Sequence, residues 1–331
     1  MDTDKLYRLV QEYIRNTPML LIGTGATIPM GIPGMKPLAD ALRSELSYSF
    51  YQTKAWEAFV VNLNAGKGLE EALTGITLPS DMLIDIRKCT WKLINDADLE
   101  LLKKIIIKRD QTPLARLIKI LTDTSAHHLD IITTNYDRYI EYSCDLCGKN
   151  VDIRSFGLYI KRRTQTSVKK NNIINLFKVH GSLDSFRNEE TKESINIPLQ
   201  EHIPDGYYPE IITPGSDKYE ALLTTDTFRS LLHEADNAIN DASAFLCIGY
   251  GFNDSQIQQN ILNRVRTGVP IIIVTRGLSD AAINLIKNNA SKYIIILCDL
   301  TENGSRIITS EEDFNIPNNV LWDIDGFIKM I

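Results

Sequence analysis

Short apolar runs alternate with helical periods from about residue 226 onward, and this alternation limits the choice of fold more than any other feature of the sequence. A short continuous apolar run is typical of a strand buried on both faces of a sheet. Parallel strands joined through helices have right-handed crossovers, so we expect a parallel sheet covered by helices on both faces. The expected strands are Ala244–Ile248, Pro270–Val274 and Tyr293–Leu297, and the expected helices are Thr227–Ala242, Asp254–Thr267 and Asp280–Asn289.

Two earlier apolar runs, Met19–Ile22 and residues 129–133, add strands to the same sheet. Between them the apolar residues recur at helical spacing, and no strand-like alternation interrupts them. We therefore predict an α/β fold with a Rossmann-like, doubly wound parallel sheet and an inserted helical module. The whole chain, residues 1–331, is expected to be one domain, with its core at residues 17–37 and 128–331 and its helical module at residues 38–127.

Charge and hydropathy argue against several classes of protein. The chain has 36 Lys and Arg against 42 Asp and Glu, a formal net charge of −6, which disfavours a general nucleic-acid coat. Its apolar runs are far shorter than the roughly 18 residues of a membrane span, and its start lacks the pattern of a signal peptide. Five sparse cysteines are typical of reduced thiols. We expect a cytoplasmic protein that does not associate with membranes.

Two segments in the middle of the chain are less regular. Residues 185–215 are polar and contain proline, so we expect a loop there. Residues 151–178 carry a run of basic side chains with Asp152 as the one acidic residue. A solvated surface is the usual interpretation of such a run, and a docking site for an acidic partner or nucleic acid is the alternative. The basic residues are Arg154, Lys161, Arg162, Arg163, Lys169, Lys170 and Lys178.

The first strand ends in a glycine turn, Gly23-Thr24-Gly25-Ala26-Thr27. Glycines at this place let the backbone approach a ligand closely, and a following helix directs N–H groups at an anion such as a pyrophosphate. The third glycine of the dinucleotide fingerprint is replaced by Ile28, so the motif alone is also compatible with an ordinary tight turn. A second glycine-containing stretch, Gly31-Ile32-Pro33-Gly34, precedes a helix expected near Pro37.

Asn135 and Asp137 directly follow the strand at residues 129–133, at the edge where open α/β sheets bind their ligands. An amide and a carboxylate two residues apart can hold a polar ligand there. The alternative is structural, with Asn135 stabilising the turn and Asp137 capping the next helix.

His180 and a second glycine turn complete the set of candidate motifs. His180 lies between an apolar run and Gly181, where a strand end would present its imidazole to a cleft. Imidazole titrates near neutral pH and can accept a proton from a reacting hydroxyl, although a lone histidine is more often structural. Gly249-Tyr250-Gly251-Phe252-Asn253-Asp254 follows the strand at 244–248, and Asp254 is placed to cap the next helix.

In this order, the four motifs resemble those of the sirtuin family. The first turn with Gly31-Ile32-Pro33 is similar to the sirtuin Gly-Ala-Gly-Ile-Ser and Gly-Ile-Pro segment. Thr134-Asn135-Tyr136-Asp137 resembles the Gln-Asn-Ile-Asp motif, and His180-Gly181-Ser182 matches the catalytic His-Gly-Ser. Residues 249–254 have the Gly-x-Gly-Phe-x-Asp form that is typical of bacterial sirtuin-like defence proteins.

The departures from the sirtuin pattern bear on activity. Deacylating sirtuins carry two Cys-x-x-Cys pairs after the catalytic histidine, and these pairs bind structural zinc. Here the pair Cys144/Cys147 precedes His180, and a closed zinc site needs four ligands, so we expect no zinc and no other metal. Met35-Lys36 and Thr134 also replace sirtuin motif residues. These changes favour the branch whose members hydrolyse NAD+ during antiphage defence.

The resemblance implies a role for each candidate residue. NAD+ is the substrate, and nicotinamide and ADP-ribose are the products. Asn135 would orient the attacking water at the nicotinamide ribose, and His180 would act as the base. Asp137 would hold the carboxamide. The other residues expected to bind NAD+ are Gly23, Thr24, Gly25, Ala26, Thr27, Ile32, Ser182, Gly249, Gly251, Phe252, Asp254 and Thr275.

Two other functions stay open at this point. The chain would be an NAD-dependent protein deacylase or ADP-ribosyl transferase if an acyl peptide were required for nicotinamide release. It would be a non-catalytic scaffold if it bound NAD+ or ADP-ribose without turnover. We also expect a homo-oligomer, and the resemblance implies a partner such as a HerA-like ATPase. The sequence leaves the activating trigger and any nuclease activity undetermined.

Overall fold

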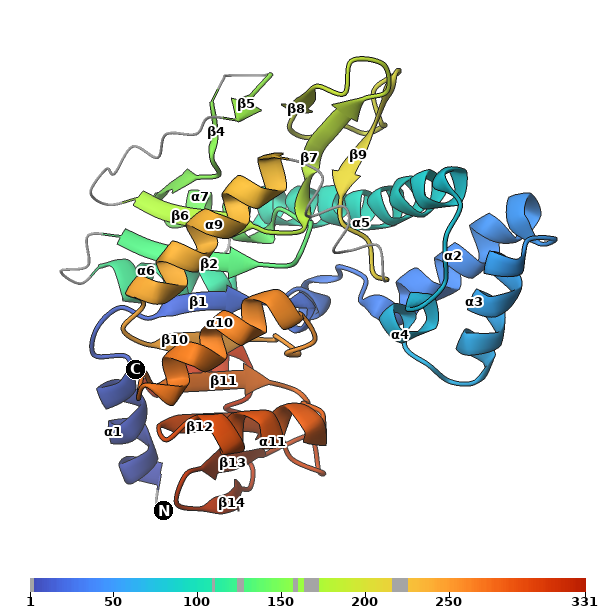
Figure 1. Ribbon diagram of the computed structural model, residues 1–331. Helices are drawn as coiled ribbons and strands as arrows, with labels where there is room; N and C mark the ends of the chain where they lie inside the picture. Colours follow the sequence, from blue (N-terminus) through green and yellow to red (C-terminus); the bar gives the residue numbers. More distant parts are fainter. Residues whose placement is uncertain (1–2, 109–110, 124–127, 157–159, 164–172, 216–225) are drawn as a thin grey trace.

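A computed structural model describes residues 3–108, 111–123, 128–156, 160–163, 173–215 and 226–331. Its centre is a nine-stranded sheet with the order β14-β13-β12-β11-β10-β1-β2-β6-β3 (Figure 1). All neighbouring strands are parallel except at the β12–β13–β14 edge. The predicted doubly wound α/β fold is therefore confirmed. The strands are β1 Met19–Ile22, β2 His128–Thr133, β3 Asn150–Asp152, β6 Ile173–Lys178, β10 Phe245–Ile248, β11 Ile271–Thr275, β12 Tyr293–Cys298, β13 Ser305–Thr309 and β14 Asp313–Ile316.

Helices cover both faces of this sheet because its central strands are apolar on both sides. In β1, Leu20 and Ile22 belong to one core cluster, and Met19 and Leu21 belong to the other. This is the two-residue period expected of a strand buried on both faces. On the first face pack α1 (Thr3–Tyr13), α6 (Pro113–Thr122), α7 (Tyr139–Leu146) and α12 (Ile324–Ile328), and on the second pack α9 (Asp226–Asp241), α10 (Ser255–Arg266) and α11 (Asp280–Asn289).

The described part of the segment between β1 and β2 is helical, as predicted. Two short 3-10 turns, η1 (Thr24–Ala26) and η2 (Ile28–Met30), precede it. Its first part has an apolar cluster of its own around Leu42 and Phe59 (the module cluster), and its helices project to one side of the sheet (Figure 1). The predicted module boundaries at residues 38 and 127 remain a proposal. The remaining helices are α2 Met35–Phe50, α3 Lys54–Asn64, α4 Leu69–Leu73 and α5 Ser80–Lys108.

The prediction of a loop over residues 185–215 is wrong. A small antiparallel sheet of three strands, with order β8-β7-β9, covers residues 185–188, 194–196 and 207–211 of this range. Its strands pair with near neighbours in the sequence, and buried Phe186 and Ile195 stand among polar residues. These strands therefore lack the continuous apolar run that marks the central strands. The strands are β7 Gly181–Asn188, β8 Ser194–Asn196 and β9 Tyr207–Ile211, and a two-stranded ribbon of β4 Ser155–Phe156 and β5 Arg162–Arg163 lies nearby.

The basic stretch contains two cations that are not solvated. Arg154 is buried, with ion pairs to Asp152 and Glu234, and its guanidinium lies over the Phe177 ring. Lys178 is buried at the end of β6. For these two residues the interpretation as a solvated surface is wrong. Residues 157–159 and 164–172, which include Lys169 and Lys170, lie outside the described residues. Across the described residues, no helix has the length and apolar character that a bilayer crossing requires.

Candidate active site

A cleft of about 920 Å³ opens at the carboxyl edge of β1, β2, β10 and β11, and its outer wall comes from α2 and α4. Ligand sites of open α/β sheets lie at this edge, and the volume is near the upper end of the usual range for ligand pockets. The cleft brings together residues from all four sequence motifs. Its predicted lining residues are Gly23, Thr24, Gly25, Ile32, Asn135, Asp137, His180, Gly249, Gly251, Asp254 and Thr275.

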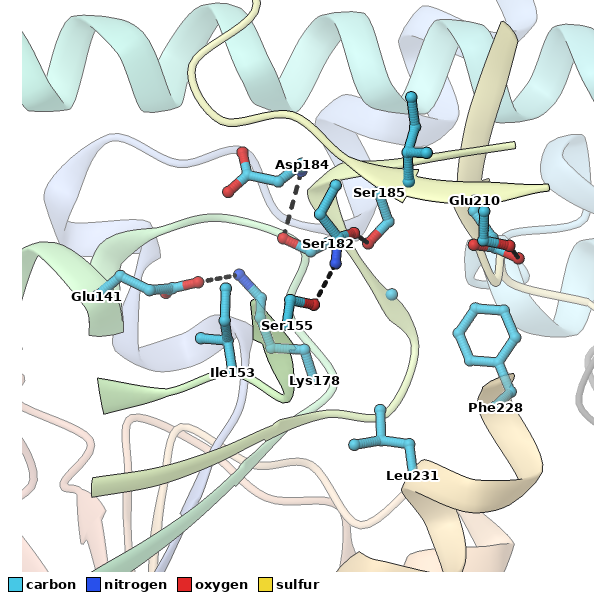
Figure 2. Close-up of a pocket in the computed structure, with 14 residues that line it drawn as sticks. Glu141, Ile153, Ser155, Lys178, Ser182, Asp184, Ser185, Glu210, Phe228 and Leu231 are labelled. Carbon is cyan, nitrogen blue, oxygen red and sulfur yellow. Dashed lines mark hydrogen bonds and ion pairs between the residues drawn. The ribbon is translucent and has the colours of Figure 1, made fainter. Parts of the chain in front are cut away.

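Four residues proposed from the sequence do not line this cleft. Ala26 and Phe252 are buried beside it, and Phe252 packs edge-on against Tyr250 at 5.0 Å between ring centroids. Thr27 contacts Asn135 instead. Ser182 lines a separate small cavity of about 50 Å³ beneath β7, where Figure 2 shows it near Ser155 and Lys178.

The glycines of the two turns face each other. A Cβ on Gly23 would lie 2.3 Å from the Gly249 carbonyl oxygen, and one on Gly25 would lie 2.7 Å from the Gly249 Cα. Gly249 itself has φ = 58°, a left-handed conformation that favours glycine. Gly25 N donates to Gly249 O at 3.0 Å. These three glycines therefore allow the turns after β1 and β10 to pack directly together, which is a different role from the close ligand approach expected of them.

Asn135 is held at the end of β2 with one polar atom left without a partner. Its backbone N–H donates to Thr133 Oγ1 at 3.0 Å, and Thr133 in turn donates to the Ile22 carbonyl on β1. Asn135 Nδ2 lies 3.5 Å from Thr27 Oγ1. The residue is 3% exposed, and among the described residues its Oδ1 finds no hydrogen-bond partner. Leaving a buried amide oxygen unpaired costs free energy, so this atom is suited to receive a ligand donor.

His180 and Asp254 form a buried pair across the cleft floor. His180 Nε2 lies 2.7 Å from Asp254 Oδ2, and the imidazole residue is 7% exposed. Asp254 Oδ1 also accepts from Ile257 N in the first turn of α10, so the carboxylate caps that helix as predicted. An imidazole that carries its proton on Nε2 donates this hydrogen bond to the Asp254 carboxylate.

Asp137 is buried beside Lys178. Burial raises the pKa of Asp137 from its ordinary 3.8 to about 7, although the charge of Lys178 opposes the shift. Lys178 Nζ donates to the Asp137 carbonyl at 2.5 Å and to Glu141 Oε1 at 2.8 Å. Lys178 therefore ties the strand that leads to His180 to the loop that carries Asp137.

Several residues of the cleft were not identified from the sequence. Arg276 follows β11 as Asn135 follows β2, so the rule of polar residues after buried strands would have found it. Glu70 and Glu71 come from α4, and no local pattern in the helical segment marks them as site residues. The His180–Asp254 contact joins residues 74 positions apart, and it depends on the order of the strands in the sheet.

In the part of the chain that the structure describes, the cysteines do not cluster with other metal-binding side chains. Cys144 is buried in α7, where burial raises the pKa of its thiol, and Cys147 is half-buried. Among the described residues, no cluster of three or more His, Cys, Asp or Glu side chains is placed to hold a metal ion.

Three of the four sequence motifs lie in a region of the chain that matches a known protein family. Residues 130–294 match a family model described as a SIR2-like domain, and this range includes Asn135, His180 and Gly249. No curated protein sequence matches the chain.

Several solved Sir2 structures are distantly similar to the chain. A structure described in terms of the mechanism and regulation of Sir2 enzymes is 13% identical with a TM-score of 0.47, over 88% of this chain and 90% of that one. Sir2Tm bound to a propionylated peptide is 13% identical with a TM-score of 0.46, over 88% and 92%. A Sir2 complex with a p53 peptide and NAD+ is 14% identical with a TM-score of 0.43, over 88% and 92%.

Proposed function

We propose that this chain, which contains a SIR2-like domain, hydrolyses NAD+ to nicotinamide and ADP-ribose. The observation that carries the proposal is the unpartnered Oδ1 of buried Asn135, in the same cleft as the His180–Asp254 pair. A ribose hydroxyl or a water molecule can donate to that oxygen. Such a donor removes the cost of the unpaired amide, so the residues fit the nicotinamide ribose of NAD+.

Cleavage of the glycosidic bond develops positive charge on the ribose, and nicotinamide leaves as a neutral molecule. The protein therefore has to place the reactants and exclude bulk water more than it has to protonate the leaving group. Asn135 orients the water that attacks the anomeric carbon. His180 takes a proton from that water or from a ribose hydroxyl, and Asp254 stabilises the imidazolium. Asp137 binds the carboxamide of the nicotinamide.

The pyrophosphate is expected at the turn after β1. Fewer hydrogen-bond donors of this turn are available to it than the glycine motif predicts. Four backbone amides of this turn already donate within the protein: Gly23 N to Ile248 O, Gly25 N to Gly249 O, Ala26 N to Gly23 O and Thr27 N to Thr24 O. The amide and hydroxyl of Thr24 are the groups left to bind a phosphate. The adenosine then extends toward Thr275 and Arg276 at the end of β11, which lies on the other side of β1 from β2 and Asn135.

We further propose that the fold needs no zinc. Residues 181–211, which directly follow His180, contain no cysteine and form a small antiparallel sheet. Trp91 of α5 packs against Phe186 of this sheet with ring centroids 5.8 Å apart. Elemental analysis of the purified protein should find well below one zinc per chain. One zinc per chain, lost in a Cys144→Ser variant that then unfolds, would contradict this.

The cellular part of the proposal is NAD+ depletion in antiphage defence. It places the protein in the cytoplasm as a homo-oligomer that acts with a partner such as a HerA-like ATPase. An enzyme that destroys NAD+ must be held inactive until it is needed, and a partner is one means of holding it.

The test is incubation of the purified chain with NAD+ alone, with and without the partner, followed by quantification of nicotinamide and ADP-ribose. Equal amounts of the two products without any peptide support hydrolysis. Nicotinamide release that strictly requires an acyl peptide would identify a deacylase or transferase instead. Saturable NAD+ binding without release under every condition would identify a binding scaffold.

A further inference from the structure

Helix α5 runs from the module cluster to two segments that carry the candidate catalytic residues (Figure 1). These segments are the Asn135–Arg138 loop and the His180–Asp184 segment. Its first turns contribute Met82 and Ile86 to the module cluster, whereas from Trp91 onward its buried apolar residues belong to the core beneath the main sheet. Trp91, Asn95 and Asp98 are spaced four and three residues apart, so they lie on one face of the helix.

Trp91 is bonded to the segment that follows His180. Its indole Nε1–H donates to the Leu183 carbonyl at 2.8 Å, and both residues are buried. Leu183 lies three residues after His180, and its own N–H donates to the Tyr136 carbonyl at 3.0 Å. The indole therefore holds the strand that begins at the His180 turn, and that strand is bonded to the loop of Asn135.

Asp98 is bonded to the segment that follows Asp137. Its Oδ1 accepts from the Arg138 backbone N–H at 2.7 Å, and its Oδ2 accepts from Arg138 Nη1 at 2.6 Å. Arg138 Nε also donates to Asp184 at 2.6 Å, in the strand held by Trp91. Asn95 accepts from both terminal nitrogens of the same guanidinium at 3.2 and 3.3 Å. A single buried arginine therefore joins α5 to both catalytic segments.

Stability alone is a weak reason for such an arrangement. The desolvation of two buried charges offsets most of their attraction, and well-packed apolar residues often stabilise a fold equally well. A directional network, by contrast, fixes the relative positions of the groups that it joins. Here Arg138 directly follows Asp137, and Leu183 and Asp184 lie three and four residues after His180.

We propose that Trp91 and Asp98 are positioning residues for NAD+ cleavage: through them, α5 holds the Asn135–Arg138 loop and the His180–Asp184 segment in the relative geometry that the reaction requires. This inference rests on the proposed function. It predicts that removing either hydrogen-bonding group lowers the rate of the chemical step more than it weakens substrate binding, because a displacement of about 1 Å can cost on the order of 10²-fold in rate.

The test uses conservative variants with a matched control. Trp91→Phe removes the indole N–H and keeps an aromatic ring against Phe186, and Asp98→Asn removes the charge with little change in shape. Trp56→Phe, in the module cluster, is the control for the loss of an indole elsewhere. We expect kcat to fall at least tenfold in Trp91→Phe and on the order of 10²-fold in Asp98→Asn, with KM for NAD+ changed less than about threefold. Trp56→Phe should keep the kcat of the parent protein.

Amide hydrogen exchange supplies a readout that does not depend on activity. Trp91→Phe should increase exchange at residues 180–184, and Asp98→Asn should increase it at residues 134–138, while β10–β12 stay protected. Parent-like kcat and parent-like exchange in a folded Trp91→Phe protein would overturn the proposal, as would an equal loss of kcat in Trp56→Phe. If the parent protein releases no nicotinamide, the proposed function fails, and exchange together with ADP-ribose affinity decides whether α5 positions these segments.

Discussion

Asn135 and His180 carry the proposed chemistry, and both are buried in the floor of the cleft. If they act on one transition state, Asn135→Ala and His180→Ala should each lower the rate of NAD+ cleavage by about 10²–10⁴. The losses should not add in the double variant, because groups that serve the same step fail together. His128→Ala, at the exposed start of the strand that Asn135 follows, is the matched control. Nicotinamide release and melting temperature are measured on the same preparations, and a folded His180→Ala protein with the parent rate would refute the mechanism.

The raised pKa of Asp137 leads us to expect that the free energy of unfolding falls as the pH rises through 7. Its pKa is raised by burial from 3.8 to about 7, against the charge of Lys178 and with a contribution from Asp98 and Glu141. The native state therefore holds this proton more tightly than the unfolded chain. The resulting stabilisation is complete below about pH 4 and is lost as the pH rises through 7.

The melting temperature of Asp137→Asn, measured relative to that of the parent, should therefore rise from pH 5 to pH 8, because an amide cannot ionise. Asp313→Asn serves as the control, since the hydrogen bond from Arg306 lowers the pKa of Asp313 and its contribution has the opposite dependence on pH. If the melting temperatures of Asp137→Asn and the parent protein change with pH in the same way over this range, Asp137 is not buried in its neutral form.

At the scale of elements, Gly23 in the first turn and Gly251 in the second should respond differently to an added side chain. A Cβ on Gly23 meets the Gly249 backbone, which cannot move without the strand behind it, so Gly23→Ala should destabilise the protein by roughly 1–3 kcal/mol. A Cβ on Gly251 meets only the side chain of Asn253 at 3.3 Å, and Gly251 lines the cleft. Gly251→Val should therefore keep the fold and weaken NAD+ binding.

Thermal melting and calorimetric titration with ADP-ribose separate the two effects. The titration uses the product so that turnover does not distort the heat. Unchanged ADP-ribose affinity in a folded Gly251→Val protein would remove the second turn from the binding site.

The parallel strands could be located from the sequence because each is a continuous apolar run between turn residues. β10, β11 and β12 were predicted to within one residue at each end. β7–β9 were missed because Ser182, Asp184 and Ser185 interrupt the apolar residues, and the core that buries Phe186 is supplied by Trp91 from a distant helix. Burial of Lys178 was missed for a similar reason, since its partner Glu141 lies 37 positions away.

At the scale of the whole molecule, the module cluster and the sheet cores are separate apolar clusters that share α5. The module cluster surrounds fully buried Phe59, and it supplies Leu38 and Leu69 to the wall of the cleft. A cluster with its own core can open locally without unfolding the rest of the protein. The cleft would then lose one wall while the strands that carry Asn135 and His180 stay folded.

Phe59→Ala tests this division. Removal of the ring should cost about 3–5 kcal/mol within the module cluster. Hydrogen exchange should rise across α2–α4, stay low in β1 and β10–β12, and be accompanied by loss of NAD+ cleavage because the cleft has lost its outer wall. Phe245→Ala removes the same side chain from the core of the main sheet, and it should raise exchange throughout the sheet. If Phe59→Ala instead raises exchange equally in both regions, the chain unfolds as one cooperative unit, and the helical segment cannot open the cleft independently of the sheet.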